Sequence, residues 1–265
     1  MDTAIYKNVL KQIDKIENDL QSGSTTITKV CIDVFTEAYS AAVENDDKKS
    51  LSDIAHKLIA AKPTMAAVIN IVNRCLQESK NYDGNDFTPI AESIKKDMDR
   101  AGDIIIGKAV NKIFIPGKKN IVITCSYSSN IIKTFEKAAA ENIDFTVMVL
   151  RSEWKGNKYH DIVIEDCSNF GVSAEMFEDT DIPGLIDLSD AALIGADAIL
   201  NGTSVINGFP SYKLARKINK DIPFYVVAES FKNSDHCTID DGFDYVPSDY
   251  ITSIISDHLF IKNNQ

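Results

Sequence analysis

The 265-residue chain lacks a long hydrophobic run: no stretch approaches the 18 or so unbroken apolar residues typical of a membrane helix. It also lacks an N-terminal basic segment followed by an apolar one, so we expect no secretion signal and a cytoplasmic location. Its five cysteines are scattered and include no Cys-x-x-Cys pair. This favours reduced thiols, with neither disulfides nor a zinc site. No Gly-x-Gly-x-x-Gly or P-loop motif is present, so we expect no dinucleotide or ATP site and no cofactor, and the cysteine spacing gives no reason to expect a metal.

Basic charge is scarce as well. The net charge is −11, and residues 118–265 hold 22 acidic against 13 basic side chains, which gives −9 for that part alone. Contact with a nucleic-acid backbone needs a basic surface, so we expect no direct nucleic-acid partner. A local anion pocket remains compatible with this charge.

The first part of the chain has a helical period. Apolar residues at 9, 13, 16 and 20 recur every three to four positions, and the same spacing recurs within residues 30–42, 54–59, 68–76 and 90–109. No segment there alternates as a strand would. We therefore predict an N-terminal helical bundle over residues 1–116.

The pattern changes after residue 117. Short β-branched or apolar segments at 121–124, 145–149, 191–194 and 223–227 read as strands, and helical segments fall between them or follow them, among them 214–218 and 251–260. Alternating strands and helices indicate a parallel sheet covered on both faces. The predicted class is α/β: a helical bundle plus a Rossmann-like parallel-sheet domain over residues 117–265.

Polar residues stand where these strands end, which is where such sheets bind ligands. Thr124, Ser126, Ser128 and Ser129 precede a helix, whose N-terminus favours an anion; simple helix capping explains the same residues equally well. Asp197, beyond the third strand, suits a catalytic or ligand-binding carboxylate, although a turn-forming role is favoured two to one by spacing alone. Lys232, past the fourth strand, could neutralise a phosphate or simply face solvent.

Two cysteines suggest a nucleophile. Cys125 lies in the first strand-end loop, and Cys167 lies further along the chain. None of the four histidines falls in the segments that hold Cys125 and Asp197, so a Cys-His pair has little support.

Six segments together resemble one family. They are residues 61–65 (Ala-Lys-Pro-Thr-Met), 123–129, 195–199 (Gly-Ala-Asp-Ala-Ile), 207–212, 224–232 and 245–251. In this order they resemble the regulatory alpha/beta/delta subunits of translation initiation factor 2B and relatives that include ribose-1,5-bisphosphate and methylthioribose-1-phosphate isomerases. The resemblance implies an N-terminal helical domain and a Rossmann-like C-terminal domain.

Departures from the family pattern bear on catalysis. In the isomerases a catalytic Cys pairs with the Asp that matches Asp197. The Cys position is Ser126 here, and Cys125 stands one residue early. A hydroxyl transfers protons far less readily than a thiol near neutral pH. A family Lys is replaced by Gly208, and a family Arg by Lys62, which keeps the charge without the bidentate fork.

The resemblance therefore implies a binding protein first: a regulatory-subunit-like protein that holds a phosphorylated sugar or a nucleoside monophosphate. The implied ligand-binding residues are Lys62, Thr124, Ser126, Ser128, Ser129, Arg151, Asp197, Asn207 and Lys232. Counting back from Gly156 aligns Arg151 with the family's arginine. Matching Ser152 to the family's serine instead puts Glu153 at that position. The alternative is an aldose–ketose isomerase acting on a ribose phosphate, with Asp197 and either Ser126 or Cys125 moving protons. The family also implies a homodimer or higher oligomer, with translation factor subunits as possible partners.

Overall fold

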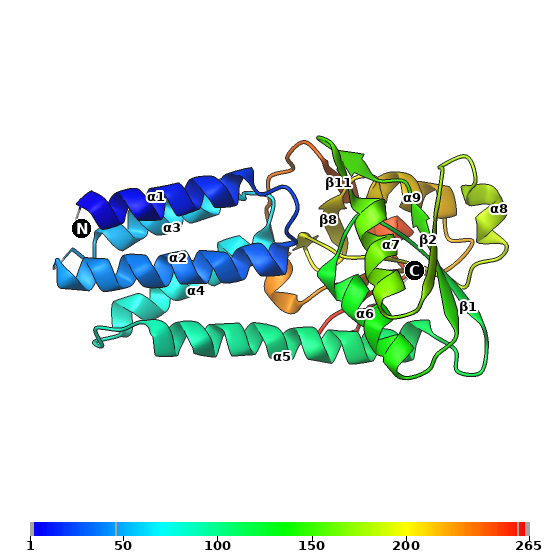
Figure 1. The fold of residues 1–265 in the computed structure, drawn as a ribbon, viewed down its shortest axis with the longest axis horizontal. Coiled ribbons are helices and arrows are strands. Elements are labelled where there is room, and N and C mark those ends of the chain that lie inside the picture. Colours follow the sequence, from blue (N-terminus) through cyan, green and yellow to red (C-terminus); the bar gives the residue numbers. More distant parts are fainter. Residues whose placement is uncertain (1–2, 46, 259, 263–265) are drawn as a thin grey trace. The chain divides into compact units, whose positions relative to one another are not determined.

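The structure is a computed structural model that describes residues 3–45, 47–258 and 260–262. The chain folds into two compact units, Met1–Arg100 and Ala101–Gln265. Helix α5 (Thr88–Ile113) begins in the first unit and continues into the second (Figure 1). None of the helices in the described residues is both long and apolar enough to cross a membrane.

The first unit is helical, as the sequence period predicts. Besides the first half of α5, it contains α1 (Thr3–Asn18), α2 (Ser24–Glu44), α3 (Ser50–Ala61) and α4 (Ala66–Asn81). Each buries one apolar stripe; in α1, Val9, Ile13 and Ile16 are at most 7% exposed. No strand occurs in the described residues of this unit. The predicted helical bundle is confirmed.

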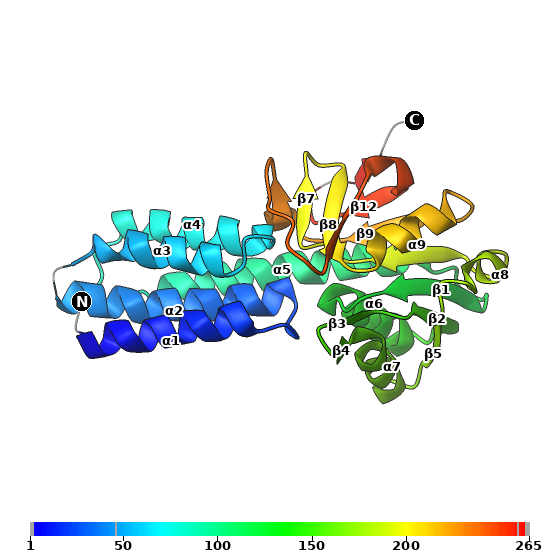
Figure 2. The ribbon, with the colours of Figure 1, turned by 90° about the horizontal axis from the view of Figure 1, so that it is seen from above.

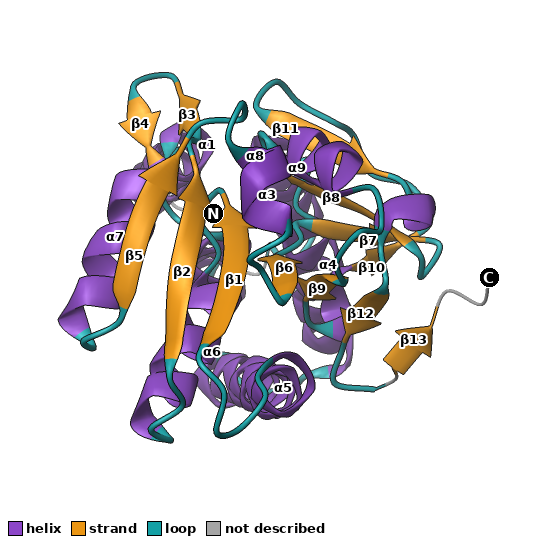
Figure 3. Ribbon diagram, turned by 90° about the vertical axis from the view of Figure 1, so that its right-hand side faces the viewer, coloured by secondary structure: helices purple, strands orange, loops and turns teal. Residues whose placement is uncertain are grey.

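The second unit is built on a seven-stranded sheet in the order β13-β12-β9-β6-β1-β2-β5 (Figure 3). Its strands are β1 (Asn120–Cys125), β2 (Phe145–Leu150), β5 (Ser173–Phe177), β6 (Ala191–Ile194), β9 (Phe224–Val227), β12 (Ser253–Ile255) and β13 (Phe260–Lys262). All neighbours pair in parallel except β12 with β13. The predicted α/β class is confirmed, and the four predicted strands are β1, β2, β6 and β9.

Two cores cover the two faces of this sheet, because successive strand residues point to opposite sides. Val122 and Leu193 face a core with the end of α5, α6 (Ser129–Ala140) and α7 (Tyr159–Asn169). Ile123, Cys125 and Ile194 face a second core with α8 (Ile182–Ile186) and α9 (Ser211–Ile218). The alternation thus aims the Cys125 side chain toward α8 and α9.

A smaller sheet packs into the second core. It has the order β10-β7-β8-β11, from β7 (Ala198–Leu200), β8 (Ser204–Gly208), β10 (Asn233–Ser234) and β11 (Phe243–Val246). Figure 2 shows β7 and β8 side by side. A short hairpin follows β2. Its two strands, β3 (Glu153–Trp154) and β4 (Asn157–Lys158), have two residues each. Short 3-10 turns, η1 (Ser230–Lys232) and η2 (Ser248–Tyr250), complete the unit.

One predicted helix is wrong. Residues 251–258 contain no helix; Ser253–Ile255 form β12, which pairs in parallel with β9, and residue 259 lies outside the described residues. The apolar residues there have helical spacing, but they are β-branched, and the place beside β9 buries them on both faces. Pairing with an existing sheet outweighs the local pattern.

Candidate functional site

The strand order places the site. The chain runs outward from β1 through β2 to β5, and outward in the other direction from β6 through β9 to β12. The two directions part between β1 and β6, and sheets of this kind bind ligands at the carboxyl ends of such a pair. Ser126 follows β1, and Gly195 to Asp197 follow β6. The structure thus brings the two predicted loops together at one crevice.

Ser126 has an unusual backbone. Its φ is +56°, a left-handed conformation that costs energy for any residue other than glycine, and its side chain is 5% exposed. Strained, buried residues of this kind gather at functional sites. The strained turn directs the chain from β1 into α6.

Asn207 holds the Ser126 hydroxyl in place. Its Nδ2 donates to Ser126 Oγ at 3.1 Å and to Ser211 Oγ at 2.8 Å. The Ser211 hydroxyl donates its own proton to the Gly208 carbonyl at 2.6 Å. All three side chains are nearly buried. The ends of β1 and β8 and the start of α9 are therefore joined by one polar network.

Cys125 turns away from this crevice into the second core. Its Sγ lies 3.6 Å from Ser211 Oγ, and since the one Ser211 proton is used on Gly208, the thiol is the donor. Burial raises the pKa of the Cys125 thiol to about 12, despite the contact with Ser211. At neutral pH Cys125 is therefore a protonated, enclosed thiol.

Ser128 stands at the N-cap position of α6, yet its side chain makes no capping hydrogen bond. It lies instead against Gly195: a Cβ atom at Gly195 would be 2.3 Å from Ser128 Oγ. Glycine at 195 is what lets the two loops approach. Ser129 is half-buried as the first residue of α6, so these hydroxyls border the positive end of the helix dipole.

Asp197 sits at a bulge in the small sheet. Its N–H donates to the Ile206 carbonyl at 2.8 Å, although Ile206 is paired with Ala198. Two residues facing one is the signature of a bulge, which re-aims a side chain. Burial, together with the negative charges of Asp197 and Asp240, raises the pKa of the Cys237 thiol to about 11. A thiol that the sequence patterns did not single out therefore lies within electrostatic reach of Asp197.

Lys232 is buried in an ion pair. Its Nζ lies 3.0 Å from Oε2 of Glu229, and that oxygen also accepts a hydrogen bond from Asn130 Nδ2 at 2.9 Å. The side chains of Lys232 and Glu229 are 4% and 1% exposed. Burial acts to raise the pKa of Glu229, but Lys232 and the hydrogen bonds outweigh it and leave that pKa below its ordinary value. Glu229 thus links the first turn of α6 to η1.

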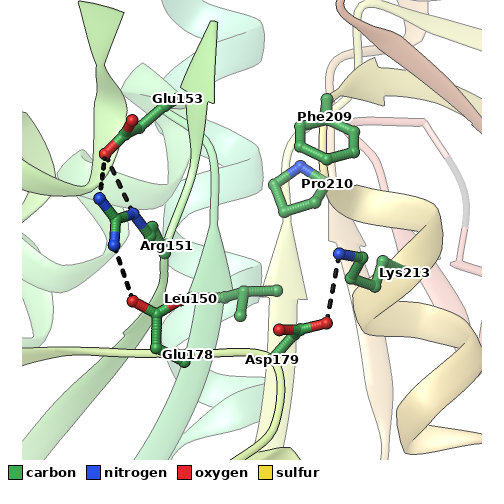
Figure 4. A pocket seen from close by; sticks show the side chains of 8 residues that line it. All are labelled: Leu150, Arg151, Glu153, Glu178, Asp179, Phe209, Pro210 and Lys213. Carbon is green, nitrogen blue, oxygen red and sulfur yellow. Dashed lines mark hydrogen bonds and ion pairs between the residues drawn. The ribbon is translucent and has the colours of Figure 1, made fainter.

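Arg151 lines a separate cavity of about 190 Å³ (Figure 4). Its Nη2 lies 3.0 Å from Glu153, and its Nη1 lies 2.8 Å from Glu178. On the other side, Lys213 pairs with Asp179 at 3.2 Å. The cavity is lined by Leu150, Arg151, Glu153, Glu178, Asp179, Phe209, Pro210 and Lys213. Arg151 is therefore engaged by two carboxylates.

The two remaining predicted residues have partners of their own. The Thr124 hydroxyl is buried and donates to the Leu193 carbonyl at 2.8 Å, within the sheet. Lys62 belongs to the first unit, where its Nζ donates to the carbonyls of Glu17 and Asp19 at 3.0 and 2.7 Å.

Sequence reasoning left out four residues that the structure makes central: Asn130, Ser211, Glu229 and Cys237. Three of them lie inside or beside the segments already quoted, so strand-end position could have marked Asn130, Ser211 and Glu229. Cys237 follows β10, a two-residue strand with no sequence signal of its own.

A helical unit and a parallel-sheet unit, with hydroxyls, an Asp and a buried Lys at the strand switch point, define a two-part α/β protein. The model of the initiation factor 2 subunit family matches residues 20–241. The chain belongs to this family.

Named relatives fall into two groups. A translation initiation factor eIF-2B subunit 2-like protein of Pyrococcus abyssi is 24% identical over 84% of this chain and 79% of its own. The ribose 1,5-bisphosphate isomerase of Archaeoglobus fulgidus is 23% identical over 86% of this chain and 72% of its own.

Solved structures show the same fold. The translation initiation factor eIF-2B of Pyrococcus horikoshii superposes with a TM-score of 0.82 at 19% identity, covering 97% of each chain. A chain of the tetrameric eIF2B beta–delta complex of C. thermophilum gives 0.77 at 16% identity, covering 98% of this chain and 92% of that one.

Proposed function

We propose that this chain is a regulatory-subunit-like member of the family that binds a phosphorylated sugar or nucleotide at the switch point without isomerising it. The hydroxyls of Ser126, Ser128 and Ser129 border the N-terminus of α6, which favours a phosphate. Asp197 is half-buried two residues after Gly195, which contacts Ser128, and a carboxylate there suits sugar hydroxyls.

The single observation that carries the non-catalytic part is the state of Cys125. A proton-transfer thiol needs access to substrate and a pKa near the working pH. The Cys125 thiol is 1% exposed, points into the second core, and has a pKa raised to about 12. The position that matches the catalytic cysteine of the isomerases is Ser126, a hydroxyl held by Asn207.

The cations of the site argue for modest affinity. Lys232 would neutralise the phosphate, yet its ammonium already contacts a carboxylate, and Arg151, in the separate cavity, is held by two carboxylates. A phosphate that contacts Lys232 must compete with Glu229 for the same ammonium. Separating these two buried charges costs free energy.

Calorimetry tests the ligand. Ribose 5-phosphate, ribose 1,5-bisphosphate and AMP are titrated into the protein, and into a Ser126→Ala, Ser128→Ala double variant. Saturable binding that the variant weakens supports the proposal. Absence of binding by all three compounds overturns the ligand part.

The regulatory part is tested separately. We expect a homodimer or larger oligomer by analytical ultracentrifugation, cytoplasmic location in fractionated cells, and recovery of translation factor subunits when the tagged chain is isolated. A monomer that recovers none of them contradicts this part.

An aldose–ketose isomerase of ribose phosphates is the second candidate. The observation in its favour is Cys237, a half-buried thiol within electrostatic reach of Asp197; it is more accessible than Cys125, although its pKa is also raised, to about 11. The assay is incubation with ribose 1,5-bisphosphate or methylthioribose 1-phosphate, with the ketose product followed by NMR. Turnover that Asp197→Asn abolishes establishes the isomerase and overturns the proposal above.

A further inference from the structure

The cavity beside Arg151 is distinct in composition from the switch-point crevice. It lies between the ends of β2 and β5 on one side and the start of α9 on the other (Figure 4). Its volume of about 190 Å³ holds roughly six water molecules. Drug-sized ligands occupy pockets of roughly 300 Å³ or more. The cavity therefore suits a metabolite smaller than a nucleotide.

Its charges do not suit a phosphate. Three carboxylates and two cations line it, so the lining is net negative. Arg151 directs its guanidinium at Glu153 and Glu178, and Lys213 directs its ammonium at Asp179. The paired side chains are 37–47% exposed. Exposed ion pairs of this kind are weak, so a ligand can exchange them.

The rest of the lining is apolar. Leu150 is buried at the end of β2, and Phe209 and Pro210 stand across from it. The Phe209 ring is 39% exposed, and Lys213 Nζ lies 5.9 Å from its centroid. A bound molecule would thus meet separated charges of both signs next to an apolar surface.

We propose that this cavity binds a small zwitterionic α-amino acid with an apolar side chain. Its carboxylate accepts from Lys213, its ammonium donates to Asp179 and Glu178, and its side chain packs on Leu150 and Phe209. When the amino acid inserts between Asp179 and Lys213, one ion pair within the protein is replaced by two ion pairs with the ligand. The net charge of the cavity stays the same, because the ligand is a zwitterion. A simple anion leaves Asp179 unmatched, and a simple cation leaves Lys213 unmatched.

The chain contains a built-in reporter. Trp154 is its single tryptophan and belongs to the β3 strand, next to Glu153. A Cβ atom at Gly242 would lie 2.6 Å from Trp154 Nε1, so the indole packs directly on that backbone. The Gly242 carbonyl in turn accepts the Phe209 N–H at 2.8 Å. Occupation of the cavity should change Trp154 fluorescence.

The test is a titration of L-leucine and L-phenylalanine, followed by Trp154 fluorescence and by calorimetry. We expect saturable binding, with L-leucinamide and N-acetyl-L-leucine each weaker by about tenfold, because each lacks one charge. No saturation at millimolar amino acid, or capped compounds that bind as tightly as L-leucine, overturns the proposal. Displacement of leucine by inorganic phosphate also overturns it.

Matched variants locate the binding. Lys213→Met and Asp179→Asn should each weaken leucine binding by about tenfold. Lys217→Met, on the exposed face of the same helix α9, and Asp187→Asn, just past α8, should leave it within about twofold. Equal effects of test and control variants contradict the assignment. Since the switch-point residues are left untouched, failure of sugar-phosphate binding is read independently.

Discussion

The ammonium of Lys232 lies 3.0 Å from a carboxylate oxygen of Glu229, with both side chains almost fully buried. The same oxygen holds Asn130 in the first turn of α6. One buried carboxylate thus sets both the charge of the lysine and the position of the helix that borders the crevice.

Glu229→Gln should lower the free energy of unfolding by about 3–5 kcal/mol at neutral pH, because Lys232 is left buried without a counter-charge. The control is Glu141→Gln, whose exposed pair with Lys137 should contribute less than about 1 kcal/mol. Urea unfolding measures both. If both variants lose the same free energy of unfolding, the buried pair contributes no more to stability than the exposed pair does.

Acid should remove this contribution. The pKa of Glu229 is lower in the folded protein than its ordinary value of 4.5, so the carboxylate stabilises the fold above that value. The contribution is lost as the pH falls through the folded pKa. We expect the stability difference between wild type and Glu229→Gln to shrink from pH 7 to about pH 3. A difference independent of pH contradicts the linkage.

Gly195→Ala should damage the crevice. The new Cβ would lie 2.7 Å from Ser128 Cβ, so the β1–α6 loop must move, at a cost of about 1–3 kcal/mol and with weaker sugar-phosphate binding. Gly184→Ala in α8 meets nothing within 4 Å and is the matched control, expected to be neutral or stabilising. Thermal unfolding and calorimetry read the two effects.

Gly208→Lys should strengthen phosphate binding. A Cβ at this position makes ordinary contact, 3.4 Å from Ser126 Cβ, so the side chain is tolerated and adds a cation beside the crevice. We expect ribose 5-phosphate to bind about tenfold more tightly. Gly208→Met, of similar length without charge, should not change the affinity. Equal gains for both would assign the effect to packing.

Thiol labelling separates the two cysteines. Cys237 is half-buried with a pKa near 11, and Cys125 is fully enclosed with a pKa near 12. In the native protein at pH 8, iodoacetamide should modify Cys237 slowly and Cys125 not at all until urea unfolds the chain. Peptide mass spectrometry measures this. Labelling of native Cys125 would reopen it as a catalytic candidate.

Local patterns were sufficient for most of the fold. The apolar period located the five N-terminal helices, and β-branched runs located β1, β2, β6 and β9, because these elements bury faces that their own residues encode. The short strands of the small sheet, together with β5 and β12, escaped detection. A strand of two to five residues has too few positions to establish a period by itself.

For the site, the sequence by itself determined which loops carry hydroxyls, a carboxylate and cations, since strand ends can be read from apolar runs. Tertiary structure alone decided what those groups do. Alternation along β1 turns Cys125 into the core, Asn207 holds Ser126, and Glu178, just after β5, pairs with Arg151. Charge and access depend on neighbours in space, and those neighbours come from segments that only the sheet order brings together.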